Sequence, residues 1–299
     1  MKDFVLYCKS YSKDFLRLKL LLQSIEQYNV EQIPFYISTP SSERSFLEEV
    51  LGTKGYNWVA DEDIVLANPK ADLDQYHAMP GGLSQQIIKA EFWRLGLAAN
   101  YLCIDSDSKF ICDFKYNDFI TDDKVPFTVL HQNKELFQLA ESRGHQKVVR
   151  DLRLEAERVK ALFGRTGPNF YCAPSPFNWS AKVWQSLDLD FLQPRAITLW
   201  DLITPAHPES LIYGEALLKY QAIPVLAIEP LFKAYHYDWQ YFLMKRLGET
   251  EKKLSRHYLG VIYQSAWDVD NQTSPSNKPL LSRLLRRVKR FGRYLQSYL

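Results

Sequence analysis

The sequence has few cysteines, and no two of them form a metal or redox motif. Its four cysteines, Cys8, Cys103, Cys112 and Cys172, lie far apart in 299 residues, with no Cys-x-x-Cys pair. A disulfide framework or a structural zinc site needs more cysteines or closely paired ones. We therefore expect neither, and the pattern fits a protein of the reducing cytosol.

Long apolar runs are also missing. No window reaches the ~18 apolar residues of a membrane-spanning helix. The first ten residues, MKDFVLYCKS, have neither the apolar length nor the cleavage site of a signal peptide. We expect a protein that is soluble or that lies on a membrane surface.

Several common functional signatures are absent from the chain. It has no G-x-G-x-x-G, no phosphate-binding P-loop, no G-x-S-x-G and no H-E-x-x-H. No nucleic-acid recognition motif is present either, so nucleic acid is not an expected partner.

The composition and the order of apolar segments predict an α/β fold. Apolar residues make up 46% of the chain and charged residues 24%, as in an ordinary packed protein. Strands and helices alternate over the first hundred residues, which predicts a mostly parallel sheet flanked by helices. A long loop is expected over 61–83. The expected strands are 4–8, 34–38, 56–60, 101–104, 127–130, 171–172 and 223–228; the expected helices are 13–28, 39–51, 84–100, two within 133–163, and 208–221.

The C-terminus differs in charge from the rest of the chain. Six of the 37 basic residues lie in 280–299, which contains no acid, so the remainder is mildly acidic. We expect one domain over 1–263, a linker over 264–279 and a basic amphipathic helix over 280–299. Such a helix suits an anionic membrane surface; docking on the protein's own body or on a partner chain are the alternatives.

The strongest chemical signal is the pair Asp105 and Asp107. The two carboxylates directly follow an apolar strand, and ligands gather at the carboxyl ends of strands in open α/β sheets. Carboxylate oxygens suit Mg²⁺ or Mn²⁺, which often keep positions open for phosphate. The alternative is a solvated turn in which the two aspartates only cap main-chain amides.

At this motif the chain resembles a known type of enzyme. The order of elements leading to Asp-Ser-Asp is similar to that of GT-A glycosyltransferases. The segment GGLSQQIIKAEFWRLGLAANYLCIDSDSKFI, residues 81–111, resembles bacterial GT-A-like proteins grouped as the DUF6492 family. The resemblance covers about residues 1–240. It implies a GT-A-like, Rossmann-type fold and transfer of a sugar from a nucleotide-sugar donor.

The resemblance also implies roles for particular residues. Asp107, with help from Asp105, is expected to hold a divalent cation (Mn²⁺ or Mg²⁺) that binds the donor's diphosphate. His236 is the expected third metal ligand, with packing in an aromatic core as the alternative. On the donor, Ser10 and Tyr11 are expected to border the nucleotide, and Gln85 and Lys89 share one helix face near the phosphates.

A catalytic base and an acceptor surface are harder to place. Glu209 resembles the acidic residue at a helix N-terminus in the family, although a carboxylate there also stabilises the helix dipole. Glu215 is the second candidate base. Trp179 and Trp239 are expected to line an acceptor cleft, whereas Trp93 is expected in the core.

Together these features predict a metal-dependent glycosyltransferase at the cytoplasmic face of the plasma membrane. Its acceptor would be a cell-envelope or extracellular glycan, lipid-linked or free. Two other functions stay open: a phosphatase or phosphotransferase in which the first aspartate is the nucleophile, and a non-catalytic binder of sugars or nucleotides.

Overall fold

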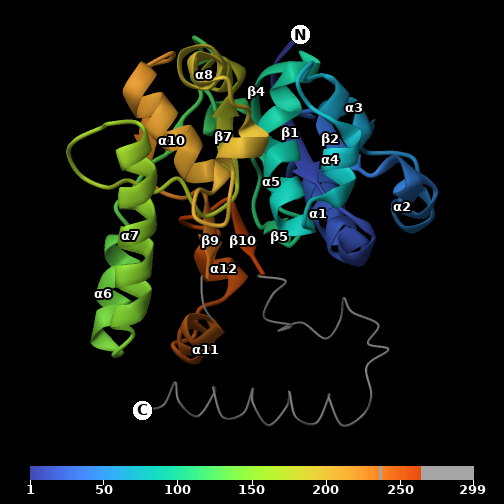
Figure 1. Cartoon of the computed structure of the whole chain (residues 1–299). Helices are drawn as coiled ribbons and strands as arrows, with labels where there is room; N and C mark the ends of the chain where they lie inside the picture. Colours follow the sequence, from blue (N-terminus) through green and yellow to red (C-terminus); the bar gives the residue numbers. More distant parts are fainter. Residues whose placement is uncertain (236–237, 264–299) are drawn as a thin grey trace, which may run out of the picture.

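A mostly parallel five-stranded sheet forms the centre of the protein (Figure 1). The computed structural model describes residues 1–235 and 238–263. The strand order is β3-β2-β1-β4-β7. Strands β1 to β4 are parallel, and β7 pairs antiparallel with β4. The bounds are β1 (Lys2–Lys9), β2 (Phe35–Thr39), β3 (Asn57–Ala60), β4 (Ala98–Cys103) and β7 (Phe177–Ser180). The α/β class predicted from the sequence is confirmed.

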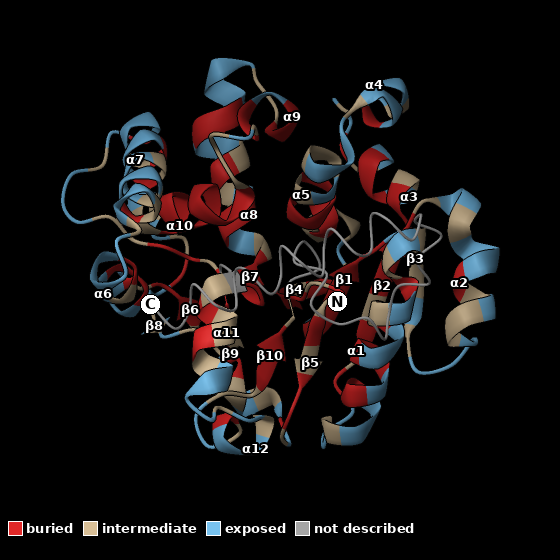
Figure 2. Ribbon diagram, turned by 90° about the horizontal axis from the view of Figure 1, so that it is seen from below, coloured by how far each residue is buried: buried red, intermediate tan, exposed pale blue. Residues whose placement is uncertain are grey.

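Helices cover both faces of this sheet, so its central strands are buried on both sides (Figure 2). Side chains of β1 alternate: Phe4 and Leu6 pack in one core with α1, while Val5 and Tyr7 pack in the other with α5, α8 and α10. Parallel strands buried in this way appear as continuous apolar runs, which is why the sequence revealed them. These helices are α1 (Phe15–Tyr28), α5 (Gly81–Glu91), α8 (Ala181–Leu187) and α10 (Glu209–Tyr220).

Two smaller sheets lie beside the main one. Strands β5 (Ser108–Phe110), β10 (Gly260–Ile262) and β9 (Phe232–Ala234) form the first, in that order. Strands β6 (Thr128–Val129) and β8 (Ala227–Ile228) form the second. The remaining α-helices are α2 (Arg44–Leu51), α3 (Asp61–Leu66), α4 (Leu73–Ala78), α6 (Lys134–Ser142), α7 (Gln146–Leu162), α9 (Leu199–Leu202), α11 (Asp238–Arg246) and α12 (Glu251–Leu254).

The long loop predicted over 61–83 is wrong, because helices α3, α4 and the start of α5 occupy it. Local capping explains the difference. The first turn of α3 carries three acidic residues, which favour a helix N-terminus. The side chain of Asp72 caps α4 by accepting a hydrogen bond from the amide of Asp74 at 2.9 Å.

The helix predicted over 84–100 is too long at its C-terminal end. Helix α5 ends at Glu91, a 3₁₀ turn follows, and Gly96 takes the left-handed conformation with φ +63°. Glycine adopts that conformation without steric cost and so ends the helical segment. Strand β4 therefore begins at Ala98, three residues earlier than expected.

Helices long and apolar enough to cross a membrane are not found within residues 1–235 and 238–263. The predicted linker over 264–279 and basic helix over 280–299 lie outside the described residues.

Candidate functional site

The ends of β1 and β4 meet where the strand order reverses. Strands β2 and β3 lie on one side of β1 in the sheet. The next strand in the chain, β4, pairs with β1 on its other side. The crevice at such a reversal, beyond the carboxyl ends of the strands, is where open α/β sheets bind ligands. Strand β1 ends there at Lys9 and is followed by Ser10 and Tyr11, and β4 is followed by Asp105 and Asp107.

A cavity of about 640 Å³ opens at this point. The N-terminal turns of α5 form one wall, from Gly81 to Lys89. The loops after β1 and β4 form most of the rest, with Pro40 and Glu43 after β2 and Tyr76 on α4. Of the residues predicted from the sequence, six line this one cavity: Ser10, Tyr11, Gln85, Lys89, Asp105 and Asp107. Segments a hundred residues apart in the chain thus converge on one space.

Ser10 is the most deeply buried of these six residues, at 2% exposure. Its hydroxyl has no hydrogen-bond partner among the described residues, although it lines the cavity. A buried polar atom without a partner costs free energy. A bound ligand would supply the missing hydrogen bond.

Lys89 forms an ion pair with Asp105. The lysine side chain is buried, whereas the carboxylate is 35% exposed and faces the cavity. Burial by itself lowers the pKa of Lys89, but the charge of Asp105, the nearby acidic groups and the hydrogen bond to Asp105 together outweigh it, so the pKa is raised and the lysine is cationic. The cavity therefore holds a fixed positive charge beside the aspartate pair.

Contacts behind the cavity fix the Asp105–Asp107 turn. The amide of Asp105 donates to the buried hydroxyl of Ser175 at 3.1 Å. The carbonyl of Asp107 accepts from the amide of Tyr263 at 2.9 Å. Strand β5 begins immediately afterwards and pairs with β10. Both contacts use main-chain atoms of the turn. The two aspartates themselves line the cavity.

Glu209 is buried at the first turn of α10, next to the cavity but not lining it. Burial raises the pKa of its carboxyl, while the positive charge of Lys89 opposes that rise. Hydrogen bonds from the first amides of its own helix also favour the carboxylate. The structure therefore places Glu209 near Lys89 and Asp105, and it also shows the capping contacts expected of an acidic residue at a helix N-terminus.

Glu215 lies away from the cavity. Arg165 donates two hydrogen bonds to its buried carboxylate, at 2.6 and 2.8 Å. This paired geometry ties α10 to the turn after α7 and occupies both oxygens. Glu215 thus has a structural partner and does not enter the cavity.

The tryptophans predicted for an acceptor cleft do not line this cavity. Trp179 is 1% exposed and packs in the core between Tyr101, Trp184 and Tyr213, so its prediction is wrong. It lies on β7, whose pairing with β4 buries it. Trp239 stacks on His145 with ring centroids 4.4 Å apart. His236 lies outside the described residues.

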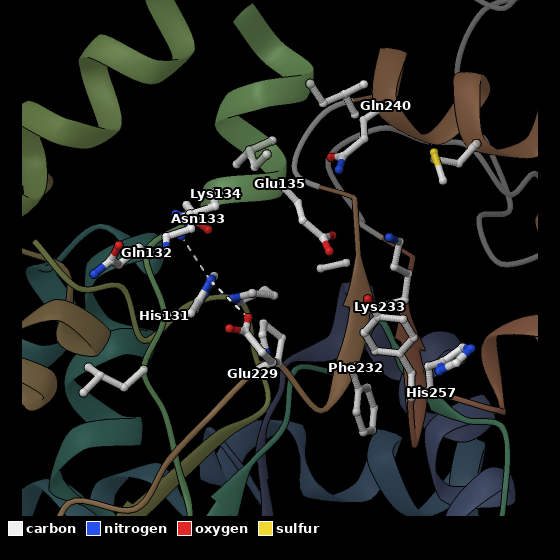
Figure 3. A pocket seen from close by; sticks show the side chains of 18 of the residues that line it. His131, Gln132, Asn133, Lys134, Glu135, Glu229, Phe232, Lys233, Gln240 and His257 are labelled. Carbon is white, nitrogen blue, oxygen red and sulfur yellow. Dashed lines mark hydrogen bonds and ion pairs between the residues drawn. The ribbon is translucent and has the colours of Figure 1, made fainter.

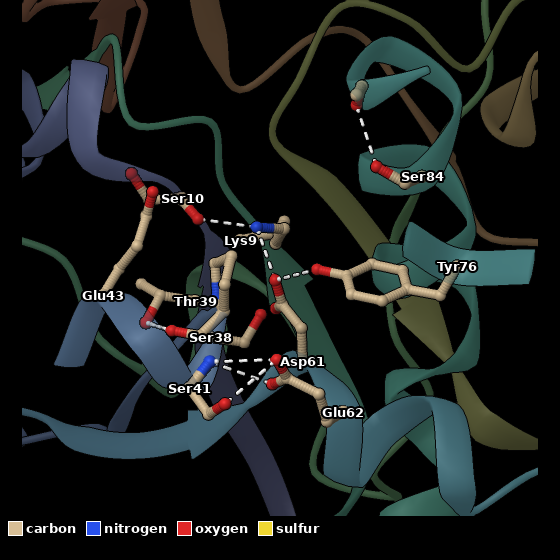
Figure 4. Close-up of polar contacts among 12 residues, drawn as sticks. Lys9, Ser10, Ser38, Thr39, Ser41, Glu43, Asp61, Glu62, Tyr76 and Ser84 are labelled. Carbon is tan, nitrogen blue, oxygen red and sulfur yellow. Dashed lines mark hydrogen bonds and ion pairs between the residues drawn. The ribbon is translucent and has the colours of Figure 1, made fainter. Parts of the chain in front are cut away.

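The sequence did not reveal a buried polar network in the cavity wall (Figure 4). Lys9 donates to the carbonyl of Ser10 at 2.6 Å and pairs with Asp61 at 2.7 Å. Tyr76, on α4, donates to the same carboxylate at 3.0 Å. Asp61 directly follows β3, so the strand-end rule that selected Asp105 could also have selected it. The network joins the ends of β1 and β3 to α4.

Replacing Tyr76 with phenylalanine tests this network. The variant should lose about 1.5 kcal/mol of unfolding free energy, because a hydrogen bond to a buried charge is removed. Chemical denaturation measures the loss. Tyr56→Phe is the control, since it removes an exposed hydrogen bond to the carbonyl of Gly52. Equal losses in the two variants would contradict a special role for Asp61.

The donor atoms at the cavity suit a hard cation that takes its other ligands from water and phosphate. No cluster of three or more His, Cys, Asp or Glu side chains arranged for a metal occurs in the part of the chain that the structure describes. Mg²⁺ is commonly held by one or two carboxylates together with substrate phosphates. Asp105 and Asp107, which open onto the same cavity, fit that pattern.

Comparison with known proteins gives one family match. A model described as a family of unknown function, DUF6492, matches residues 4–207. The matched region contains every residue that lines the cavity and ends just before α10. No curated protein matches the chain.

Proposed function

We propose that this chain, which belongs to the DUF6492 family, is a metal-dependent glycosyltransferase that uses a nucleotide-sugar donor. One observation carries the proposal: both aspartates, the N-terminus of α5 and the end of β1 open onto one cavity at the reversal of strand order. The family is described as one of unknown function, so the proposed glycosyl transfer rests on these residues.

The cavity has the features that a diphosphate needs. The first turns of α5 line the space, so the positive end of the helix dipole lies at the cavity and favours an anion. Lys9, Lys13 and Lys89 also line the space, where Lys9 is paired with Asp61 and Lys89 with Asp105. A divalent cation on Asp105 and Asp107 would neutralise the phosphate oxygens and stabilise the departing nucleoside diphosphate. The volume falls within the usual range for a small-molecule site, about 300–1,000 Å³.

The lining also offers places for the nucleoside. Tyr11 is 41% exposed at the rim, so one face of its ring can stack on a base. The unpartnered hydroxyl of Ser10 and the amide of Gln85 can bond polar groups of the donor. We therefore keep Ser10, Tyr11, Gln85 and Lys89 as donor-binding residues of the proposed GT-A-type enzyme.

Glu209 is the base in this proposal. An inverting transfer needs a carboxylate that removes a proton from the acceptor hydroxyl. Of the two carboxylates considered, only Glu209 lies near Lys89 and Asp105, whereas Glu215 is bound to Arg165. A cell-envelope glycan as acceptor, and an anionic membrane as the partner of 280–299, stay predictions.

Donor turnover tests the proposal. The full chain is incubated with UDP-glucose, UDP-galactose, UDP-N-acetylglucosamine and GDP-mannose, with Mn²⁺ or with EDTA, and free nucleoside diphosphate is measured. We expect slow, Mn²⁺-dependent release from at least one donor, with water as the acceptor. Phosphate release from p-nitrophenyl phosphate would instead support a phosphatase. Binding of a donor without any turnover would support a non-catalytic binder.

A further inference from the structure

A second cavity, of about 750 Å³, lies between α6, β9 and α11 (Figure 3). Neither aspartate of the first cavity lines it. Glu135 reaches into it from α6, Lys233 from β9 and Gln240 from α11. None of the proposed donor-binding residues lines this second cavity.

A short segment of chain links the second cavity to the aspartate turn of the first. Pro174 lines the second cavity, and the next residue, Ser175, accepts the hydrogen bond from the amide of Asp105. The hydrogen bond to Ser175 therefore joins the aspartate turn to a residue whose neighbour in the chain lines the second cavity.

His131, which lines the second cavity, makes a hydrogen bond to the chain next to Pro174. Its Nδ1 accepts from the amide of Asn133 at 3.3 Å, so Nε2 carries the proton and donates to the carbonyl of Ala173 at 2.7 Å. Both ring nitrogens are thus engaged. His131 acts as a support of the wall and leaves ligand binding to its neighbours.

The small three-stranded sheet connects the two cavities a second time. Strand β5 begins directly after Asp107, β10 pairs with it, and β9 pairs with β10. Residues 232–234 of β9 line the second cavity. The aspartate turn is therefore connected to the lining of the second cavity through this sheet as well as through the hydrogen bond to Ser175.

The lining chemistry of the second cavity indicates a neutral ligand rich in hydroxyl groups. Its lysines and glutamates balance in charge, because the lining contains Lys134 and Lys233 together with Glu135 and Glu229. Side-chain amides supply both donors and acceptors, and aromatic rings supply apolar faces of the kind that pack on a sugar ring. The amides are Gln132, Asn133 and Gln240, and the partly exposed rings are Phe170 and Tyr258.

We propose that this second cavity binds a neutral oligosaccharide, which is the acceptor of the transfer and whose reacting end extends out of the cavity, past Pro174 and Ser175, to reach the donor. The acceptor role rests on the proposed function. The saccharide site itself stands on the lining residues, so the two claims can fail separately.

Calorimetric titration with maltotetraose, cellotetraose and chitotetraose tests the saccharide site on the full chain. We expect at least one of them to bind. The double variant Gln132→Ala, Glu135→Ala, which removes two exposed lining side chains, should weaken that binding about tenfold. The matched control is Gln138→Ala, Glu141→Ala, two exposed residues of α6 that do not line the cavity; it should bind as the parent does.

The outcomes separate this proposal from the donor site. No binding of any of the three saccharides, or equal weakening in both double variants, overturns the second site while nucleotide binding is unaffected. Asp107→Ala should still bind the saccharide, because it does not line the second cavity. Loss of saccharide binding in that variant would also contradict a separate site.

Discussion

Asp107→Ala is expected to weaken Mn²⁺-dependent binding of UDP by about a hundredfold or more. The variant loses one of the two carboxylates that open onto the cavity at the end of β4. Loss of a group that only supports a metal ligand already costs about 10- to 100-fold in affinity. Loss of a direct ligand should cost at least the upper end of that range.

Titration calorimetry with UDP, in Mn²⁺ and in EDTA, measures this effect. Asp113→Ala is the control, because Asp113 is an exposed acid after β5 that does not line the cavity. The thermal unfolding of both variants should match that of the parent. Unchanged UDP affinity in a folded Asp107→Ala would remove the metal role from the account.

Lys9→Met is expected to cost about 3–5 kcal/mol of unfolding free energy near neutral pH. Its ammonium pairs with Asp61 in the cavity wall, where the two side chains are 7% and 0% exposed. Removing one partner leaves a buried charge without compensation, and this is the costly way to break a buried ion pair. Lys124→Met is the control, because its ion pair with Asp3 is exposed and contributes little.

The cost of Lys9→Met should depend on pH. Burial raises the pKa of Asp61, and Lys9 opposes that rise. Without the lysine the pKa in the folded state rises further, so the folded variant binds a proton at a pH where the unfolded chain does not. Its stability therefore falls as pH rises toward the folded pKa and recovers as pH is lowered.

Urea denaturation of the parent and of Lys9→Met at about pH 8 and about pH 5 measures this dependence. The difference in unfolding free energy between the parent and the variant should be smaller at the lower pH. If the loss of unfolding free energy is equal at the two pH values, or larger at the lower one, then Asp61 is not the buried charge that Lys9→Met leaves without a partner.

The part of the site predicted from the sequence is the part that follows the parallel strands. Strands β1 and β4 are apolar on both faces and end in polar residues, so their ends could be found without knowing their neighbours. The rule that ligands gather at such ends indicated Ser10 and Asp105, and both line one cavity in the structure. The same rule, applied to Asp61 after β3, would also have found the network of Lys9.

Features that depend on distant pairing could not be predicted in this way. Strand β7 is recognised only through its pairing with β4, and that pairing is what buries Trp179. Glu215 finds its partner Arg165 fifty residues earlier in the chain. The second cavity likewise combines α6, β9 and α11, which are far apart in the sequence and carry no common motif.

The central claim is that the aspartates after β4 hold a cation that holds a diphosphate. Anomalous scattering from crystals grown with Mn²⁺ and UDP tests it most directly. The account predicts a manganese peak in the cavity of about 640 Å³, with an oxygen of Asp107 and a diphosphate oxygen each about 2.1 Å from the metal. UDP bound in that cavity without manganese, or manganese bound away from Asp105 and Asp107, would contradict it.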